Sequence, residues 1–119
     1  MIRIYGASDD LVEIEGHPSG DEVGCYDRDV FIVLGNAETG GVAVRMSYAP
    51  QLGKGVAFGC WTAEIGQLDE DVAIPWPITL TTAKRNPKAP ECGYSVCVNI
   101  DAPADVPLVY SAVKHGRDE

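Results

Sequence analysis

A basic cluster near two tryptophans is the combination of residues in this sequence that best suits ligand binding. Lys84, Arg85 and Lys88 lie in one short stretch of an otherwise acidic chain, and Trp61 and Trp76 precede them. Cationic groups beside aromatic rings can hold a small anionic ligand such as a nucleotide, by charge and by stacking. The simpler interpretation is a polar hairpin loop beside two core tryptophans, and both stay open at this point.

Cysteine and histidine residues offer no recognisable catalytic set. Cys60 or Cys97 with His17 or His115 would make a nucleophile–base pair only if the fold brought them together. Both histidines fall in segments expected to be loosely held, whereas a general base must be fixed within hydrogen-bond reach of its nucleophile. We therefore predict no catalytic residues, with an enzyme that uses an unrecognised Cys/His or carboxylate site as a remaining alternative.

The spacing of the cysteines argues against a metal site. Cys92 and Cys97 are the nearest pair, and a separation of five places their side chains on opposite faces of a strand. A structural zinc site needs four ligands in paired short spacings, which the chain does not supply. The acidic runs Asp9–Asp10 and Asp69–Asp71 are typical of turns, and they lack the spacing of a calcium-binding loop. No metal and no cofactor are predicted.

The charge distribution excludes several classes of partner. The 119 residues carry a net charge of −9, and eight of the 18 acidic residues fall within the first 29 positions. Nucleic-acid binding requires clustered Lys and Arg, and anionic lipid surfaces attract basic segments, so neither partner is expected. The start of the chain lacks the apolar core of a signal peptide, and no apolar run reaches the length of a membrane span. The sequence therefore predicts a soluble cytoplasmic protein with free thiols.

Alternating apolar and polar residues indicate the elements that must position these groups. This two-residue period, rich in β-branched and aromatic residues, is typical of strands. It predicts strands over residues 1–5, 11–15, 30–34, 42–48, 56–65, 78–82 and 92–100, separated by loops or turns over 6–10, 16–27, 35–41, 50–55, 66–71, 84–91 and 101–107.

Three of these segments carry finer expectations. Val30–Leu34 is continuously apolar, which favours a central strand buried on both faces. Gly59 inside 56–65 suggests a bulge or a bend. Leu108–Val113 is ambiguous, because its β-branched residues favour a strand while Asp105 and Pro107 before it suit the start of a short C-terminal helix.

The fold class follows from the number and spacing of the strands. Seven to nine short strands with turn residues between them predict a single β-rich domain over residues 1–119, either an antiparallel sandwich or a partly open barrel. For 42–48, Val42, Val44, Met46 and Tyr48 should face the core, and Ala43, Arg45 and Ser47 should face outward.

The opening residues resemble those of a group of small proteins. The run Tyr5-Gly-Ala-Ser-Asp-Asp-Leu-Val-Glu-Ile-Glu-Gly16 is similar to the Tyr-Gly-x-Ser-Asp-Asp-Leu-(Ile/Val)-Glu-(Ile/Val)-Glu-Gly run that begins small uncharacterised proteins of actinobacteria and their phages. The resemblance covers about a tenth of the chain. It implies a bacterial or phage origin and brings no activity with it.

Taken together, these observations favour a non-enzymatic binding protein that acts through a protein partner, with self-association through an exposed strand edge as one route. The alternative is a protein that sequesters a small anionic, nucleotide-like ligand at Lys84, Arg85, Lys88, Trp61 and Trp76.

Overall fold

The protein is described by a computed structural model that covers residues 1–8, 10–19, 22–25, 29–53, 56–85 and 94–112. Side-chain positions are described for all of these except residues 49–53, 56–60, 82–85, 94 and 95. Nine strands and no helix occur within these ranges. No helix that could cross a membrane is therefore present in this part of the chain.

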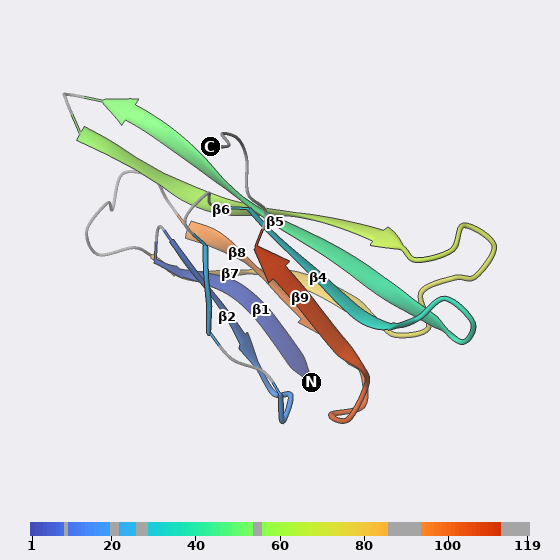
Figure 1. Ribbon diagram of the computed structural model, residues 1–119. Coiled ribbons are helices and arrows are strands. Elements are labelled where there is room, and N and C mark those ends of the chain that lie inside the picture. The colour runs from blue at the N-terminus through green and yellow to red at the C-terminus, as the bar shows by residue number, and fades with distance from the viewer. Residues whose placement is uncertain (9, 20–21, 26–28, 54–55, 86–93, 113–119) are drawn as a thin grey trace, which may run out of the picture.

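The strands form two antiparallel sheets that pack face to face without closing into a barrel (Figure 1). Sheet A has the order β3-β2-β1-β8-β7, and sheet B has the order β6-β5-β4-β9. Their bounds are β1 Ile2–Ser8, β2 Leu11–Glu15, β3 Glu22–Gly24, β4 Asp29–Asn36, β5 Gly40–Gly53, β6 Val56–Gln67, β7 Ile78–Arg85, β8 Tyr94–Ile100 and β9 Leu108–Ala112. The prediction of an antiparallel β-sandwich is confirmed.

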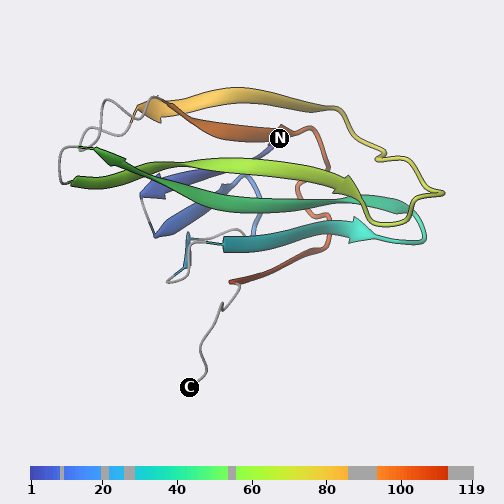
Figure 2. The same ribbon diagram turned by 90° about the horizontal axis from the view of Figure 1, so that it is seen from above.

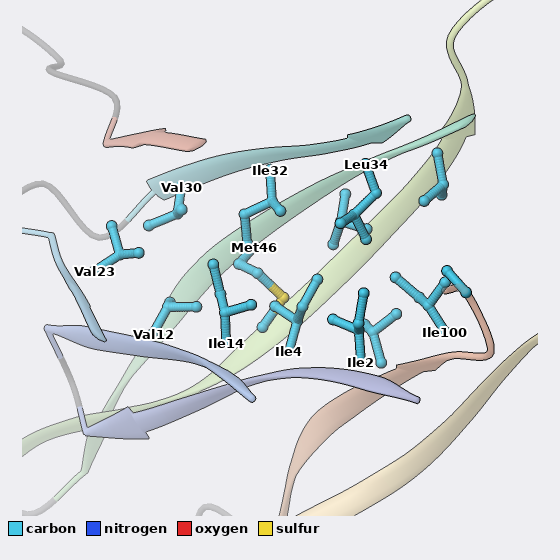
Figure 3. Close-up of a cluster of buried hydrophobic side chains, with 14 of the residues drawn as sticks. Ile2, Ile4, Val12, Ile14, Val23, Val30, Ile32, Leu34, Met46 and Ile100 are labelled. Carbon is cyan, nitrogen blue, oxygen red and sulfur yellow. The ribbon is translucent and has the colours of Figure 1, made fainter. Parts of the chain in front are cut away.

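The core lies between the sheets and follows the predicted alternation (Figure 3). Every second residue of each inner strand points inward, because successive side chains of a strand leave opposite faces. The figure shows Ile2, Ile4, Val12 and Ile14 of sheet A directed at Val30, Ile32, Leu34 and Met46 of sheet B. All eight are at most 3% exposed. The predicted inward set of β5 is also confirmed, with Tyr48 partly buried at its end.

Two expectations about strands of sheet B were wrong, the burial of both faces of 30–34 and the bulge at Gly59. β4 lies inside sheet B, between β5 and β9, but only one of its faces is buried: Phe31 is 43% exposed on the outer face. The reason is that no element of the described residues covers the outer face of sheet B. The outward-facing residues of the apolar run 30–34 therefore form an exposed apolar patch instead of a second buried face. β6 pairs with β5 continuously from Val56 to Gln67, with Pro50 opposite Gly59 and no bulge.

Several strands are longer than predicted. β1 runs to Ser8, into the predicted turn 6–10, and β5 runs to Gly53, through most of the predicted loop 50–55. The strands around the predicted turn 35–41 also extend into it, and β6 runs to Gln67, into the predicted turn 66–71. Strand pairing continues past the turn residues because every residue except proline offers both a backbone N–H and a C=O group to the ladder.

Three further boundaries differ from the predicted ones. β3 lies within the predicted loop 16–27. Val23 pairs with Val12 and is buried in the core, although the Gly- and acid-rich sequence around it is typical of a loop. β7 runs on to Arg85, into the predicted loop 84–91. Leu108–Ala112 is a strand, so the C-terminal helix is wrong for these residues: pairing with the buried strand β4 outweighs the local capping signals.

Candidate functional site

Trp61, one of the two predicted stacking residues, is a core residue. It lies in β6, is 2% exposed, and its indole Nε1–H donates a 2.5 Å hydrogen bond to the carbonyl of Ser8 at the end of β1. Its ring also meets Tyr48 edge to face, with 5.5 Å between the ring centroids. Gly6 lies against the ring so closely that a Cβ atom there would overlap it. The indole therefore ties sheet B to sheet A.

Trp76, the second predicted stacking residue, lies near the other end of the sandwich. It is half-buried in the segment before β7 and approaches Gly35, near the end of β4. Trp61 pairs with Tyr48 on the ladder, whereas Gly35 pairs with Gly41, seven residues earlier on β5. At about 3.3 Å per residue, these positions are roughly 20 Å apart along the strand. The structure does not bring the two tryptophans together.

The basic part of the predicted ligand site falls largely outside the described residues. The backbone of Lys84 and Arg85 forms the end of β7, but their side chains are not described, and neither is Lys88. Arg85 pairs with Tyr94 at the start of β8, and the start of β8 lies beside the end of β1, where Ser8 is found. Because Trp61 donates a hydrogen bond to Ser8, the end of β7 and Trp61 lie at the same end of the sandwich. Sequestration of a nucleotide-like ligand stays a prediction, and a thermal-shift assay against a nucleotide panel tests it.

The described residues Cys25 and His17 contact backbone groups and not each other, whereas a catalytic pair would require a hydrogen bond between thiol and imidazole. The Cys25 thiol is buried and bonds both the backbone carbonyl and the N–H of Asp29, at 2.9 and 2.8 Å. His17 Nε2 contacts the carbonyl of Val106 in the loop after β8. His115 and the side chain of Cys60 lie outside the described residues. Within these limits, no group of three or more His, Cys, Asp or Glu side chains is arranged to hold a metal ion.

The outer face of sheet A carries a polar cluster built on β1 and β2. The Tyr5 hydroxyl lies 2.6 Å from a carboxylate oxygen of Glu13 and 2.7 Å from one of Glu15, and Arg3 lies 3.6 Å from Glu15. Because a hydroxyl has one proton, it can donate to one carboxylate at a time. Burial, followed by these two hydrogen bonds and the carboxylate charges, raises the pKa of Tyr5 well above its ordinary value.

The same face continues across β8 and β7. The Asn99 amide donates to the carbonyl of Thr79 and to the hydroxyl of Thr81, both at 2.9 Å. Cys97, next to Tyr5 on the ladder, is 7% exposed, and burial raises the pKa of its thiol. A raised pKa reduces the thiolate fraction, and the thiolate is the reactive form. This cluster therefore stabilises the sheet and lacks an activated nucleophile.

The outer face of sheet B combines an arginine with an exposed aromatic ring. The Arg45 guanidinium lies 3.6 Å from Asp29, 4.0 Å from Glu64 and 5.5 Å from the centre of the Phe31 ring. Phe31 and Val33 lie beside Ser111 and Val109 of β9, because these residues are ladder partners. Exposed aromatic and Arg side chains are enriched where proteins bind one another.

The sequence indicated a possible strand at Leu108–Val113, but not that this strand, β9, lies at the edge of a sheet. β9 borders sheet B, and no other strand of the described residues pairs with its outer edge (Figure 2). Val109 is 67% exposed and Tyr110 is 36% exposed. The signal available in the sequence was the uncharged, β-favouring run Leu-Val-Tyr-Ser-Ala, but only the sheet order reveals that this run lies at an edge.

Comparisons with known proteins provide no relative: no family model, no curated protein and no solved structure matches this chain.

Proposed function

We propose that this protein is a non-enzymatic binding protein that accepts an extended segment of a protein partner along β9. The observation that carries the proposal is the uncharged, exposed edge of β9 beside the apolar side chains Phe31, Val33 and Val109. Strand addition suits such an edge: backbone hydrogen bonds supply affinity, and side-chain contacts at alternate positions supply specificity.

The chemistry of the surface defines the partner segment. It should be extended, uncharged or basic, and apolar at alternate positions, because it meets Val109 on one face and the whole protein carries a charge of −9. A cytoplasmic location belongs to the same proposal and is supported by the free thiols of Cys25 and Cys97.

Comparative capture with matched variants tests the proposed function. Val109→Lys places a charge at the edge, a device that natural edge strands use to prevent pairing. Leu80→Lys is the control, since Leu80 is 54% exposed on β7, one of the two edge strands of the other sheet. The resemblance of residues 5–16 makes actinobacterial lysates the first choice for the capture.

The expected result is a partner retained by the wild type and by Leu80→Lys but lost with Val109→Lys, with slower hydrogen exchange at 108–112 when the purified partner is added. Equal capture by all three proteins, or a partner that leaves exchange at 108–112 unchanged, would rule out β9 as the binding edge.

A further inference from the structure

The hydrogen-bonding direction of each β9 residue follows from one contact at its start. Gly35 N–H donates to the carbonyl of Pro107 at 2.9 Å, in the same register as the ladder between β4 and β9. Antiparallel partners alternate between hydrogen-bonded and non-hydrogen-bonded pairs. Val109 and Ser111 therefore bond to β4, whereas the N–H and C=O groups of Leu108, Tyr110 and Ala112 point away from it, toward the open edge.

Among the four edge strands of the described sheets, β9 is the one without charge. β3 carries Glu22, β6 carries Glu64, and β7 carries Lys84 and Arg85, whereas β9 has neither a charged residue nor a proline. Charged residues and prolines are the usual protection of an edge against pairing with another chain. In a chain with a net charge of −9, β9 is thus the edge where a second copy meets the least like-charge repulsion.

We infer that the partner at β9 is a second copy of this chain, paired antiparallel about a two-fold axis at Tyr110. This inference rests on the proposed function, because it assigns the occupant of the same edge. In this register Leu108 faces Ala112 of the second copy, and Tyr110 faces Tyr110 of the second copy. All three outward-directed residues then lie opposite one another and make about six backbone hydrogen bonds. Moving the axis by one residue in either direction leaves one of the three without a partner.

The side chains also suit this register. On the outer face, Val109 lies beside Ser111 of the second copy, so the exposed apolar row from Val33 and Val109 continues toward Phe31 of that copy. On the inner face, the two Tyr110 rings form a cross-strand aromatic pair, which stabilises antiparallel strands. Sheet B would then run unbroken through both copies with a self-complementary interface.

The mass of the full-length protein in solution tests the inference. We expect sedimentation at about 0.1 mM to give twice the 12.7 kDa of one chain. Tyr110→Lys should yield monomers, since it sets two like charges against each other at the axis. Leu80→Lys should remain dimeric, and circular dichroism of both variants checks that the sandwich is retained.

Amide hydrogen exchange identifies the interface itself. In the wild type, Leu108, Tyr110 and Ala112 should exchange as slowly as Val109 and Ser111. In Tyr110→Lys, positions 108 and 112 should exchange at least tenfold faster, while 109 and 111 stay protected by β4.

A monomeric wild type at this concentration would overturn the second copy as the occupant, and the capture experiment on Val109→Lys would still decide the proposed function separately. A dimer in which Leu108, Tyr110 and Ala112 exchange rapidly would overturn the inference too, because the copies would then meet on another surface.

Discussion

The absence of a side chain at Gly6 leaves room for the indole ring of Trp61. The indole ring occupies the space that a Cβ at Gly6 would need, and its bond to the Ser8 carbonyl prevents it from moving away. We predict that Gly6→Ala lowers the free energy of unfolding by about 1–3 kcal/mol, as overpacking of a core does. Urea denaturation measures the change.

The matched control for Gly6→Ala is Gly66→Ala. Gly66 also lies in a strand, but a Cβ there would meet nothing within 4 Å. Its midpoint should stay at or above that of the wild type. Equal midpoints for the two variants would mean that Trp61 can shift to admit the methyl group.

Tyr5 contributes a pH-dependent share of stability. Its pKa is raised in the folded protein, so its contribution is complete below the unfolded-state value of about 10 and is lost as pH rises through the folded-state value. We predict that stability declines less steeply between about pH 9 and 11 in Tyr5→Phe than in the wild type. Thermal melts across this range measure both slopes, and parallel slopes would show that the hydroxyl titrates as in the unfolded chain.

At the scale of the elements, Asn99 fastens the edge strand β7 to β8. This residue is 9% exposed and its amide donates to the Thr79 carbonyl and the Thr81 hydroxyl across the ladder, so Asn99→Ala removes both hydrogen bonds. We predict a loss of about 1–3 kcal/mol, with faster hydrogen exchange over 78–81. Thr79→Ala is the control, because Thr79 lies directly opposite with an exposed side chain and donates nothing to Asn99. Equal losses would assign the effect to the strand pairing alone.

At the scale of the whole molecule, the net charge of −9 opposes the association of two copies. Salt shortens the screening length from about 10 Å at 0.1 M to about 3 Å at 1 M. We predict that the dissociation constant of the dimer falls several-fold over this range, as measured by sedimentation equilibrium. A dimer that weakens as salt rises would point to an interface held by opposite charges, which β9 does not contain.

Local alternation was sufficient to predict most strands, because the pleat sends successive side chains to opposite faces whatever the partners are. It assigned the inward side of Val42, Val44 and Met46 correctly. It failed where pairing decided the outcome. Val23 becomes a core residue through its pairing with Val12, and Phe31 is exposed because the described residues leave its side of the sheet uncovered.

The candidate site was less predictable than the fold. Trp61 and Trp76 are near in sequence but stand at opposite ends of the sandwich, because β6 reverses direction relative to β5 and carries the chain away from Trp61. Exposure of an aromatic ring depends on which sheet covers it, and no local pattern encodes that.

The sequence by itself determined the alternation, the acidic charge and the lack of a recognised catalytic motif, all of which are local or additive properties. The tertiary structure alone decided the strand order, in which β1 pairs with β8 from the far end of the chain and β9 becomes an edge. The physical reason is that strand pairing satisfies backbone groups of any sequence, so the choice of partner rests on how the whole core packs.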